Sequence, residues 1–167
     1  GAFALRLLNE KYKLNIPTQD LIGYAAKLGS DCPFFIINQA CYATGRGEIL
    51  NSIQLNLSKY YFVLVNPGIH VNTKWAFEQI TPAPSNKNLA SILSEPIEEW
   101  RDLLVNDFEA PITKAYPTIG NIKNQLYQLG ASYAAMSGSG STVFGIFKMK
   151  PSDKIKSAFD CSVFITS

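Results

Sequence analysis

The run Tyr-Tyr-Phe-Val-Leu-Val at residues 60–65 most constrains how this chain folds. Every side chain in it is aromatic, β-branched or leucine, which indicates a strand buried on both faces. The Asn-Pro-Gly sequence at 66–68 ends it. A fold that contains residues 60–65 must therefore place neighbouring strands beside them and cover the sheet with helices.

Other strands and helices are expected on the C-terminal side of this run. The further strands are predicted at 133–136, 142–147 and 162–166. The helices are predicted at 97–104, 108–115, 119–129 and 152–159, with a helix from Asn72 or Thr73 through Ile80 and a turn-rich segment at 81–95. This order is typical of an α+β fold with helices on one face of an antiparallel sheet, close to a ferredoxin-like arrangement.

The N-terminal part has a different pattern. Helices are predicted at 2–12 and, with Thr18 as the N-cap, at 19–27. Two short strands at 40–44 and 48–55 are expected to form a hairpin. The first helix starts at the first residue without a capping residue, so we expect that the chain has been cut from a longer protein.

Composition narrows the class of protein. Hydrophobic residues make up 47% of the 167 residues and charged residues 17%, which predicts a well-formed core. A net charge of +2 is too small to indicate binding to nucleic acid or to an anionic membrane. No apolar stretch approaches the roughly 20 residues of a membrane span. A cytoplasmic protein with no nucleic-acid or membrane partner is expected.

Cysteine and histidine usage excludes several kinds of site. The three cysteines are an odd number without a Cys-x-x-Cys pair, which disfavours a disulfide framework and favours a reducing compartment. The single histidine, His70, disfavours a histidine-rich metal site or a spare histidine for a catalytic triad. No metal-ligating residue is predicted.

The loop Ser137-Gly138-Ser139-Gly140-Ser141 joins two predicted strands. Glycines let the backbone approach a ligand closely, and the amides and hydroxyls of such a loop can donate to phosphate oxygens. The alternative is an ordinary flexible hairpin loop. The loop has no lysine of a P-loop and no following helix of a dinucleotide fingerprint, so neither of those two sites is predicted.

Asp31 lies between a helix-ending glycine and a proline, in the sequence Leu-Gly-Ser-Asp-Cys-Pro-Phe-Phe at 28–35. The surrounding residues would fix the position of this carboxylate. A general base needs position and orientation more than an unusual pKa. The alternative for Asp31 is a simple cap of the turn at Pro33.

Two other loops have both a plain and a functional interpretation. Gly45-Arg46-Gly47 could be nothing more than a hairpin turn, and residues 67–73 could be a plain strand-to-helix loop. A loop that enters a helix N-terminus is, however, also a natural anion site. Trp75 or Phe77 could stack on a base, although most such aromatic residues belong to the core. His70 is expected to be a surface or loop residue.

Taken in order, five segments resemble the GHMP small-molecule kinases. They are LGSDCPFF at 28–35, GRGEIL at 45–50, PGIHVNT at 67–73, NDFE at 106–109 and LGASYAAMSGSGSTVFGIF at 129–147. The resemblance covers residues 1 to about 147. It implies a GHMP kinase fold, in which 1–57 are a remnant of the N-terminal domain (similar to ribosomal S5 domain 2) and 58–167 are the ferredoxin-like C-terminal domain.

The resemblance also implies a reaction. The expected substrates are ATP with Mg²⁺ and a small molecule, cytidine diphosphate methylerythritol, whose 2-hydroxyl is phosphorylated during non-mevalonate isoprenoid precursor synthesis. The resemblance implies that Asp31 is the catalytic base and that Phe77 packs on the cytosine ring. It places near the phosphates the Thr73 hydroxyl and the loop of Ser137, Gly138, Ser139, Gly140 and Ser141. It places along the cytidine the residues Gly45, Arg46 and Gly47.

The family's glycine-rich ATP loop and early lysine have no counterpart in these 167 residues. This chain by itself is therefore not expected to catalyse. An apolar surface left uncovered by missing strands would favour a homodimer. Another GHMP kinase, acting on homoserine, mevalonate or a sugar, is the first alternative. A non-catalytic ferredoxin-like interaction or RNA-binding module is the second, although it would need a basic patch with exposed aromatic residues, which is not evident.

Overall fold

The computed structural model describes residues 1–45, 47–81 and 88–167. It divides into two compact units, Gly1–Leu55 and Asn56–Ser167, which we describe one at a time. Arg46 lies outside the described residues, so the expectation for its role stays a prediction. No helix of the described segments is long and apolar enough to cross a membrane.

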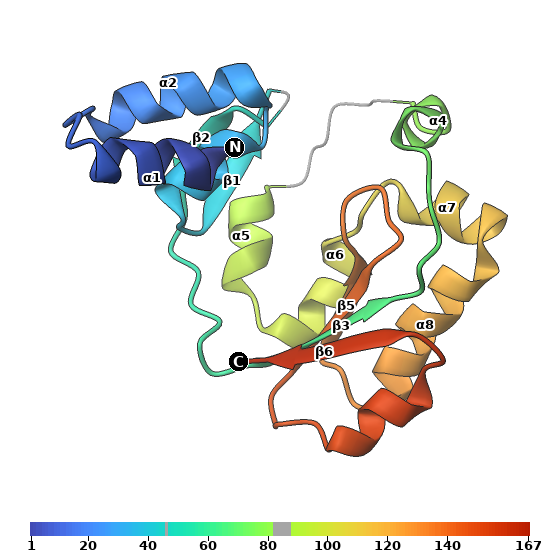
Figure 1. The fold of residues 1–167 in the computed structure, drawn as a ribbon. Coiled ribbons are helices and arrows are strands. Elements are labelled where there is room, and N and C mark those ends of the chain that lie inside the picture. Colours follow the sequence, from blue (N-terminus) through green and yellow to red (C-terminus); the bar gives the residue numbers. More distant parts are fainter. Residues whose placement is uncertain (46, 82–87) are drawn as a thin grey trace. The chain divides into compact units, whose positions relative to one another are not determined.

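The second unit is built on a four-stranded antiparallel sheet (Figure 1). Its strands are β3 (Tyr61–Asn66), β4 (Tyr133–Met136), β5 (Val143–Phe147) and β6 (Ser162–Thr166). The order across the sheet is β4-β5-β3-β6, so the first strand in sequence is central. This is the order of a ferredoxin-like sheet, and the predicted α+β fold is confirmed.

The central position of β3 accounts for its apolar run, but burial on both faces is only partly confirmed, because Phe62 and Leu64 on the second face are half-buried. Val63 and Val65 of β3 are completely buried, with β5 on one side and β6 on the other. Helix α8 (Pro117–Gln128) packs against β4 and β5 through Ile119, Ile122 and Leu126, which recur at helical spacing. Helix α7 (Glu109–Ala115) packs on α8 and buries Ile112 in the same core.

The other helices of the second unit are short. They are α4 (Thr73–Glu78), α5 (Leu89–Ser94), the 3-10 helix η1 (Ile97–Glu99), α6 (Trp100–Leu103) and the 3-10 helix η2 (Asp153–Ala158). Asn72 caps α4 by accepting a hydrogen bond from the Trp75 amide at 3.0 Å, in agreement with the prediction of a cap at 72 or 73.

The first unit contains three helices and a hairpin. They are α1 (Ala2–Lys11), α2 (Thr18–Leu28), α3 (Cys32–Ile37) and the antiparallel strands β1 (Cys41–Thr44) and β2 (Ile49–Ser52). A small core of Ala2, Leu21, Ala25 and Ile36 joins the helices. The predicted helix–helix–hairpin order is present, with α3 added between α2 and the hairpin, where the sequence predicted no element.

Four local predictions were wrong, and one of them is the helix expected over 152–159, where the structure has the 3-10 helix η2. Thr18 is the first residue of α2 and not its cap, because the Pro17 carbonyl accepts the amides of Asp20 and Leu21. The turn-rich segment contains helix α5, whose first turn is capped by the Asn88 side chain. The single helix expected over 97–104 is a 3-10 turn followed by a short α-helix.

Candidate functional site

The glycine-serine loop between β4 and β5 is a closed, hydrogen-bonded turn. The Ser137 amide donates to the Thr142 carbonyl at 2.8 Å, and the Gly140 amide donates to the Ser137 carbonyl at 3.0 Å. Gly138 and Gly140 have φ angles of +55° and +90°, which L-residues with side chains rarely adopt. A Cβ at Gly140 would also lie 2.9 Å from the Met136 sulfur. The sequence needs glycine here to make this turn.

The loop meets the start of α4. The Thr73 and Ser139 hydroxyl oxygens are 3.3 Å apart, although the residues are separated by 66 positions. Two of the residues predicted to bind phosphate are thus brought together. Helix α4 has only six residues, so we assign no anion site to its N-terminus, and Thr73 contributes through its hydroxyl.

Donors for an anion are available in this loop. Within the described part of the chain, the backbone N–H groups of Gly138 and Ser139 donate to no acceptor. Ser137 and Gly138 are exposed, Ser139 and Gly140 are half-buried, and Ser141 is buried. Backbone amides and hydroxyls in a tight turn suit phosphate oxygens. The donor set therefore fits the phosphate end of a nucleotide.

The two aromatic residues of α4 differ in their surroundings. Phe77 is 59% exposed and contacts the edge of Phe108, with ring centroids 4.9 Å apart. Trp75 is half-buried and packs on Tyr116 beside the core. Only Phe77 of this pair presents an open ring face that could receive a base. His70 is an exposed loop residue, as the sequence indicated.

Asp31 and Gly47 lie against each other in the first unit. Asp31 is exposed, precedes α3, and makes no capping hydrogen bond to that helix. Its Oδ1 accepts a hydrogen bond from the Ser30 hydroxyl at 3.3 Å and lies 3.1 Å from where a Cβ at residue 47 would be. The alternative of a simple helix cap for Asp31 therefore has no hydrogen bond to support it.

Gly45 and Gly47 have φ angles of +70° and +109°, and a Cβ at Gly45 would touch the Glu48 carboxylate at 3.1 Å. A hollow of about 310 Å³ lies beside this turn. It is lined by Ala26, Lys27, Leu28, Gly29, Ser30 and Glu48. The turn and the hollow give the first unit a small polar surface next to Asp31.

Carboxylates and the single histidine do not gather into a metal site. Among the described residues, no group of three or more His, Cys, Asp or Glu side chains could hold a metal ion. A Mg²⁺ ion that accompanies a nucleotide is commonly held by phosphate oxygens, one or two protein groups and water.

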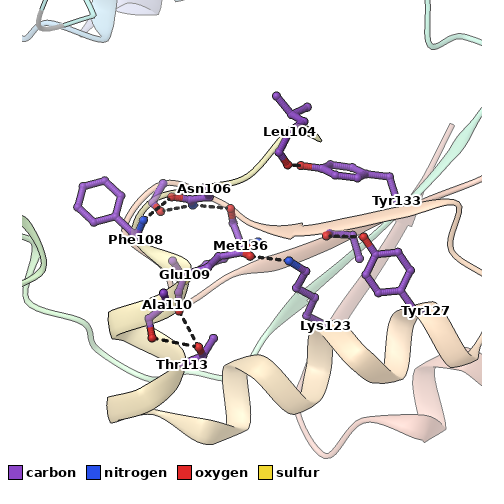
Figure 2. Close-up of polar contacts among 12 residues, drawn as sticks. Leu104, Asn106, Phe108, Glu109, Ala110, Thr113, Lys123, Tyr127, Tyr133 and Met136 are labelled. Atoms are coloured by element: carbon purple, nitrogen blue, oxygen red, sulfur yellow. Dashed lines mark hydrogen bonds and ion pairs between the residues drawn. The ribbon is translucent and has the colours of Figure 1, made fainter. Parts of the chain in front are cut away.

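No role follows from the sequence for Asn106, Glu109 and Lys123, which form a polar cluster around Met136, the residue before the glycine-serine loop (Figure 2). The signal for the first two was the NDFE motif, which was noted without a function. Tyr133 lies in the same region, and its hydroxyl donates to the Leu104 carbonyl at 2.7 Å. Burial, followed by the Glu109 charge, raises the pKa of Tyr133 well above its usual range.

Comparison with known proteins adds sequence and fold relationships. Residues 87–166 match the family described as GHMP kinases, C terminal. Over 155 residues the chain is 47% identical to a 4-diphosphocytidyl-2-C-methyl-D-erythritol kinase of Bacteroides fragilis, a match that covers 93% of this chain and 56% of the relative. Over 162 residues it is 44% identical to the enzyme of the same name from Parabacteroides distasonis, covering 96% of this chain and 60% of the relative.

A solved structure shares the fold. The crystal structure of a 4-(cytidine 5'-diphospho)-2C-methyl-D-erythritol kinase superposes with a TM-score of 0.82, at 24% identity, over 98% of this chain and 61% of that one. The chain thus spans 56% to 60% of the length of the two relatives named above. The likeness to the solved structure shows that the two chains share their fold.

Proposed function

We propose that the protein shares the reaction of the 4-diphosphocytidyl-2-C-methyl-D-erythritol kinases, because residues 87–166 match the GHMP kinase C-terminal family and the chain is homologous over most of its length to those kinases. The reaction is ATP-dependent phosphorylation of the 2-hydroxyl of 4-diphosphocytidyl-2-C-methyl-D-erythritol, a step in non-mevalonate isoprenoid precursor synthesis. We place the protein in the cytoplasm.

One observation carries the proposal furthest. The loop Ser137–Ser141 and the Thr73 hydroxyl meet at 3.3 Å, in two segments that the family resemblance separately assigned to the phosphates. Phosphoryl transfer relies on positioning and on stabilising the charge of the transferred group. Hydroxyls and unpaired amides gathered at one turn are suited to both tasks.

Each residue takes a defined role in this proposal. Asp31 accepts the proton of the substrate hydroxyl as that oxygen attacks the γ-phosphorus, and the bond from this phosphorus to the bridging oxygen breaks to release ADP. Ser139 and Thr73 hold phosphate oxygens, and Phe77 packs on the cytosine ring. The backbone at 45–47 follows the cytidine. When bound, Mg²⁺ neutralises negative charge that develops on the phosphate oxygens.

The proposed domain organisation follows the family. We assign residues 1–57 to part of the N-terminal GHMP kinase domain and 58–167 to the C-terminal domain. No lysine of this chain takes the part of the family's early lysine, and the family's ATP loop has no match in the 167 residues. We therefore expect the isolated chain to show no turnover.

A phosphorylation assay tests the function. The protein is expressed from the complete reading frame that contains this sequence and incubated with γ-labelled ATP, Mg²⁺ and 4-diphosphocytidyl-2-C-methyl-D-erythritol. Parallel reactions contain homoserine, mevalonate or galactose. Transfer of label to the cytidyl substrate alone supports the proposal. Transfer to one of the other acceptors, with a folded protein, would move the protein to a different branch of the kinases.

A further inference from the structure

The side chain of Asn106 forms hydrogen bonds to the glycine-serine loop and to the residue that precedes it. Its Nδ2 donates to the carbonyl oxygen of Met136 at 2.9 Å and to the carbonyl oxygen of Gly138 at 2.8 Å. Its Oδ1 accepts a hydrogen bond from the Phe108 amide at 3.0 Å, which fixes which way the side-chain amide faces. The Asn106 amide thus uses both its oxygen and its nitrogen. The nitrogen donates to the residue before the loop and to the second residue of the loop (Figure 2).

Glu109 binds Met136, the residue that precedes the loop. This carboxylate is only 8% exposed. Its Oε1 accepts a hydrogen bond from the Met136 amide at 2.6 Å, and its Oε2 pairs with the Lys123 ammonium of α8. Buried carboxylates need such partners, because an unpaired buried charge is costly. The N–H of Met136 is therefore bound by Glu109 and its C=O by Asn106.

Because the peptide unit is planar, the hydrogen bonds of Asn106 also set the directions of the neighbouring N–H groups. In a trans peptide the C=O of one residue and the N–H of the next point in opposite directions. When Asn106 binds the Gly138 carbonyl, the Ser139 N–H is turned away from Asn106. That N–H donates to no acceptor among the described residues. The same relation at Met136 turns the Ser137 N–H toward the Thr142 carbonyl, 2.8 Å away.

We propose that Asn106 is a positioning residue for phosphoryl transfer, which aims the Ser139 N–H at a phosphate oxygen by holding the Met136 and Gly138 carbonyls. Glu109 supports it by fixing Met136. This inference rests on the proposed function for the identity of the anion. The orientation of the loop by Asn106 rests on the contacts alone, so the two can be tested apart.

The central variant is Asn106→Asp in the protein expressed from the complete reading frame. Aspartate has the same shape and keeps an oxygen to accept from the Phe108 amide. Its second oxygen replaces Nδ2, so two hydrogen bonds become contacts between oxygen atoms. Asn124→Ala is the matched control, because Asn124 is an exposed residue of α8.

Two measurements are made on each folded variant. The rate of amide hydrogen exchange at Ser137 reports the geometry of the loop without any substrate. We expect this rate to be about tenfold higher in Asn106→Asp than in the wild type, which corresponds to the loss of about one hydrogen bond. Steady-state kinetics report positioning. We expect kcat per folded enzyme to fall about 10- to 100-fold with the KM of the cytidyl substrate nearly unchanged.

A second pair of variants keeps the test decisive if Asn106→Asp does not fold. Glu109→Gln retains an oxygen for the Met136 amide, whereas Glu109→Ala removes it. Gln is expected to restore both the slow Ser137 exchange and the rate that Ala loses. Equal losses in Gln and Ala would contradict the supporting role given to Glu109.

The outcomes separate the two proposals. The inference is overturned if Ser137 in Asn106→Asp exchanges at the wild-type rate. It is also overturned if Asn106→Asp keeps the wild-type kcat although its Ser137 exchange is faster. If the wild-type protein transfers no phosphate to the cytidyl substrate, the proposed function fails. In that case a faster Ser137 exchange in Asn106→Asp still supports the role of Asn106 in orienting the loop. An unchanged exchange rate contradicts that role.

Discussion

The hydroxyl oxygen of Thr73 lies 3.3 Å from that of Ser139, which links the first turn of α4 to the loop between β4 and β5. Neither strand pairing nor the helix requires this contact. It brings a residue that follows the central strand to the loop that precedes β5, at one end of the sheet.

Removal of the Thr73 hydroxyl should therefore weaken catalysis more than stability. Thr73→Val keeps the side-chain shape, and we expect kcat/KM to fall about three- to tenfold, the effect of one modest hydrogen bond. Ser139→Ala should cause a similar loss, and the double variant should lose less than the two single losses combined, because both changes remove the contact that the hydroxyls share. Fully additive losses would show that the two hydroxyls act independently.

Asp31→Asn tests the proposed general base. We expect kcat to fall about 10²- to 10⁴-fold, since proton transfer by a positioned side chain contributes an effect of that size. Asp20→Asn, on the exposed face of α2, is the matched control and should keep the wild-type rate. Substantial turnover by Asp31→Asn in single-turnover kinetics would remove Asp31 from the catalytic role.

Gly140→Ala tests the backbone requirement of the loop. Its φ of +90° and the 2.9 Å approach of the Met136 sulfur predict a loss of about 1–3 kcal/mol in the free energy of unfolding. Gly23→Ala is the control. Gly23 lies inside α2 with open space around its Cβ position, so alanine should stabilise the protein by about 0.5–1 kcal/mol. Urea denaturation measures both values.

The ion pair of Lys148 and Glu98 predicts a pH effect. The Lys148 ammonium lies 2.7 Å from Glu98 Oε1, and this hydrogen bond is the largest cause that lowers the pKa of Glu98 below its ordinary value of 4.5. A lowered carboxyl pKa contributes stability above the ordinary pKa, and that contribution is lost as pH falls through the pKa of the folded protein.

Lys148→Met should therefore raise the pKa of Glu98, as measured by NMR titration of its carboxyl carbon. The difference in urea midpoint between Lys148→Met and the wild type should shrink when the pH is taken below 4.5. Lys150→Met, at a neighbouring exposed position, should leave the Glu98 titration unchanged. A Glu98 pKa that is the same in all three proteins would contradict the pairing.

The sequence by itself determined the second unit most fully. The strands at 133–136 and 162–166 have the predicted bounds, and the apolar run at 60–65 is the central strand β3, shifted by one residue. Strand β4 is buried along its whole length, which leaves a continuous apolar run, whereas β6 alternates exposed and half-buried residues, and both patterns are readable in a sequence. Helix α5 was missed because it is six residues long, which is too short for the apolar period of a helix to repeat.

The site required the tertiary structure. Sequence motifs named Thr73, Asp31 and the Ser137–Ser141 loop, but only the fold brings Thr73 to Ser139 and Asp31 to Gly47. The roles of Asn106 and Glu109 depend on which carbonyl and amide groups of the loop face them. The directions of these carbonyl and amide groups are fixed only once β4 and α7 have taken their places in the fold. Local sequence preferences carry no information about contacts between segments so far apart in the chain.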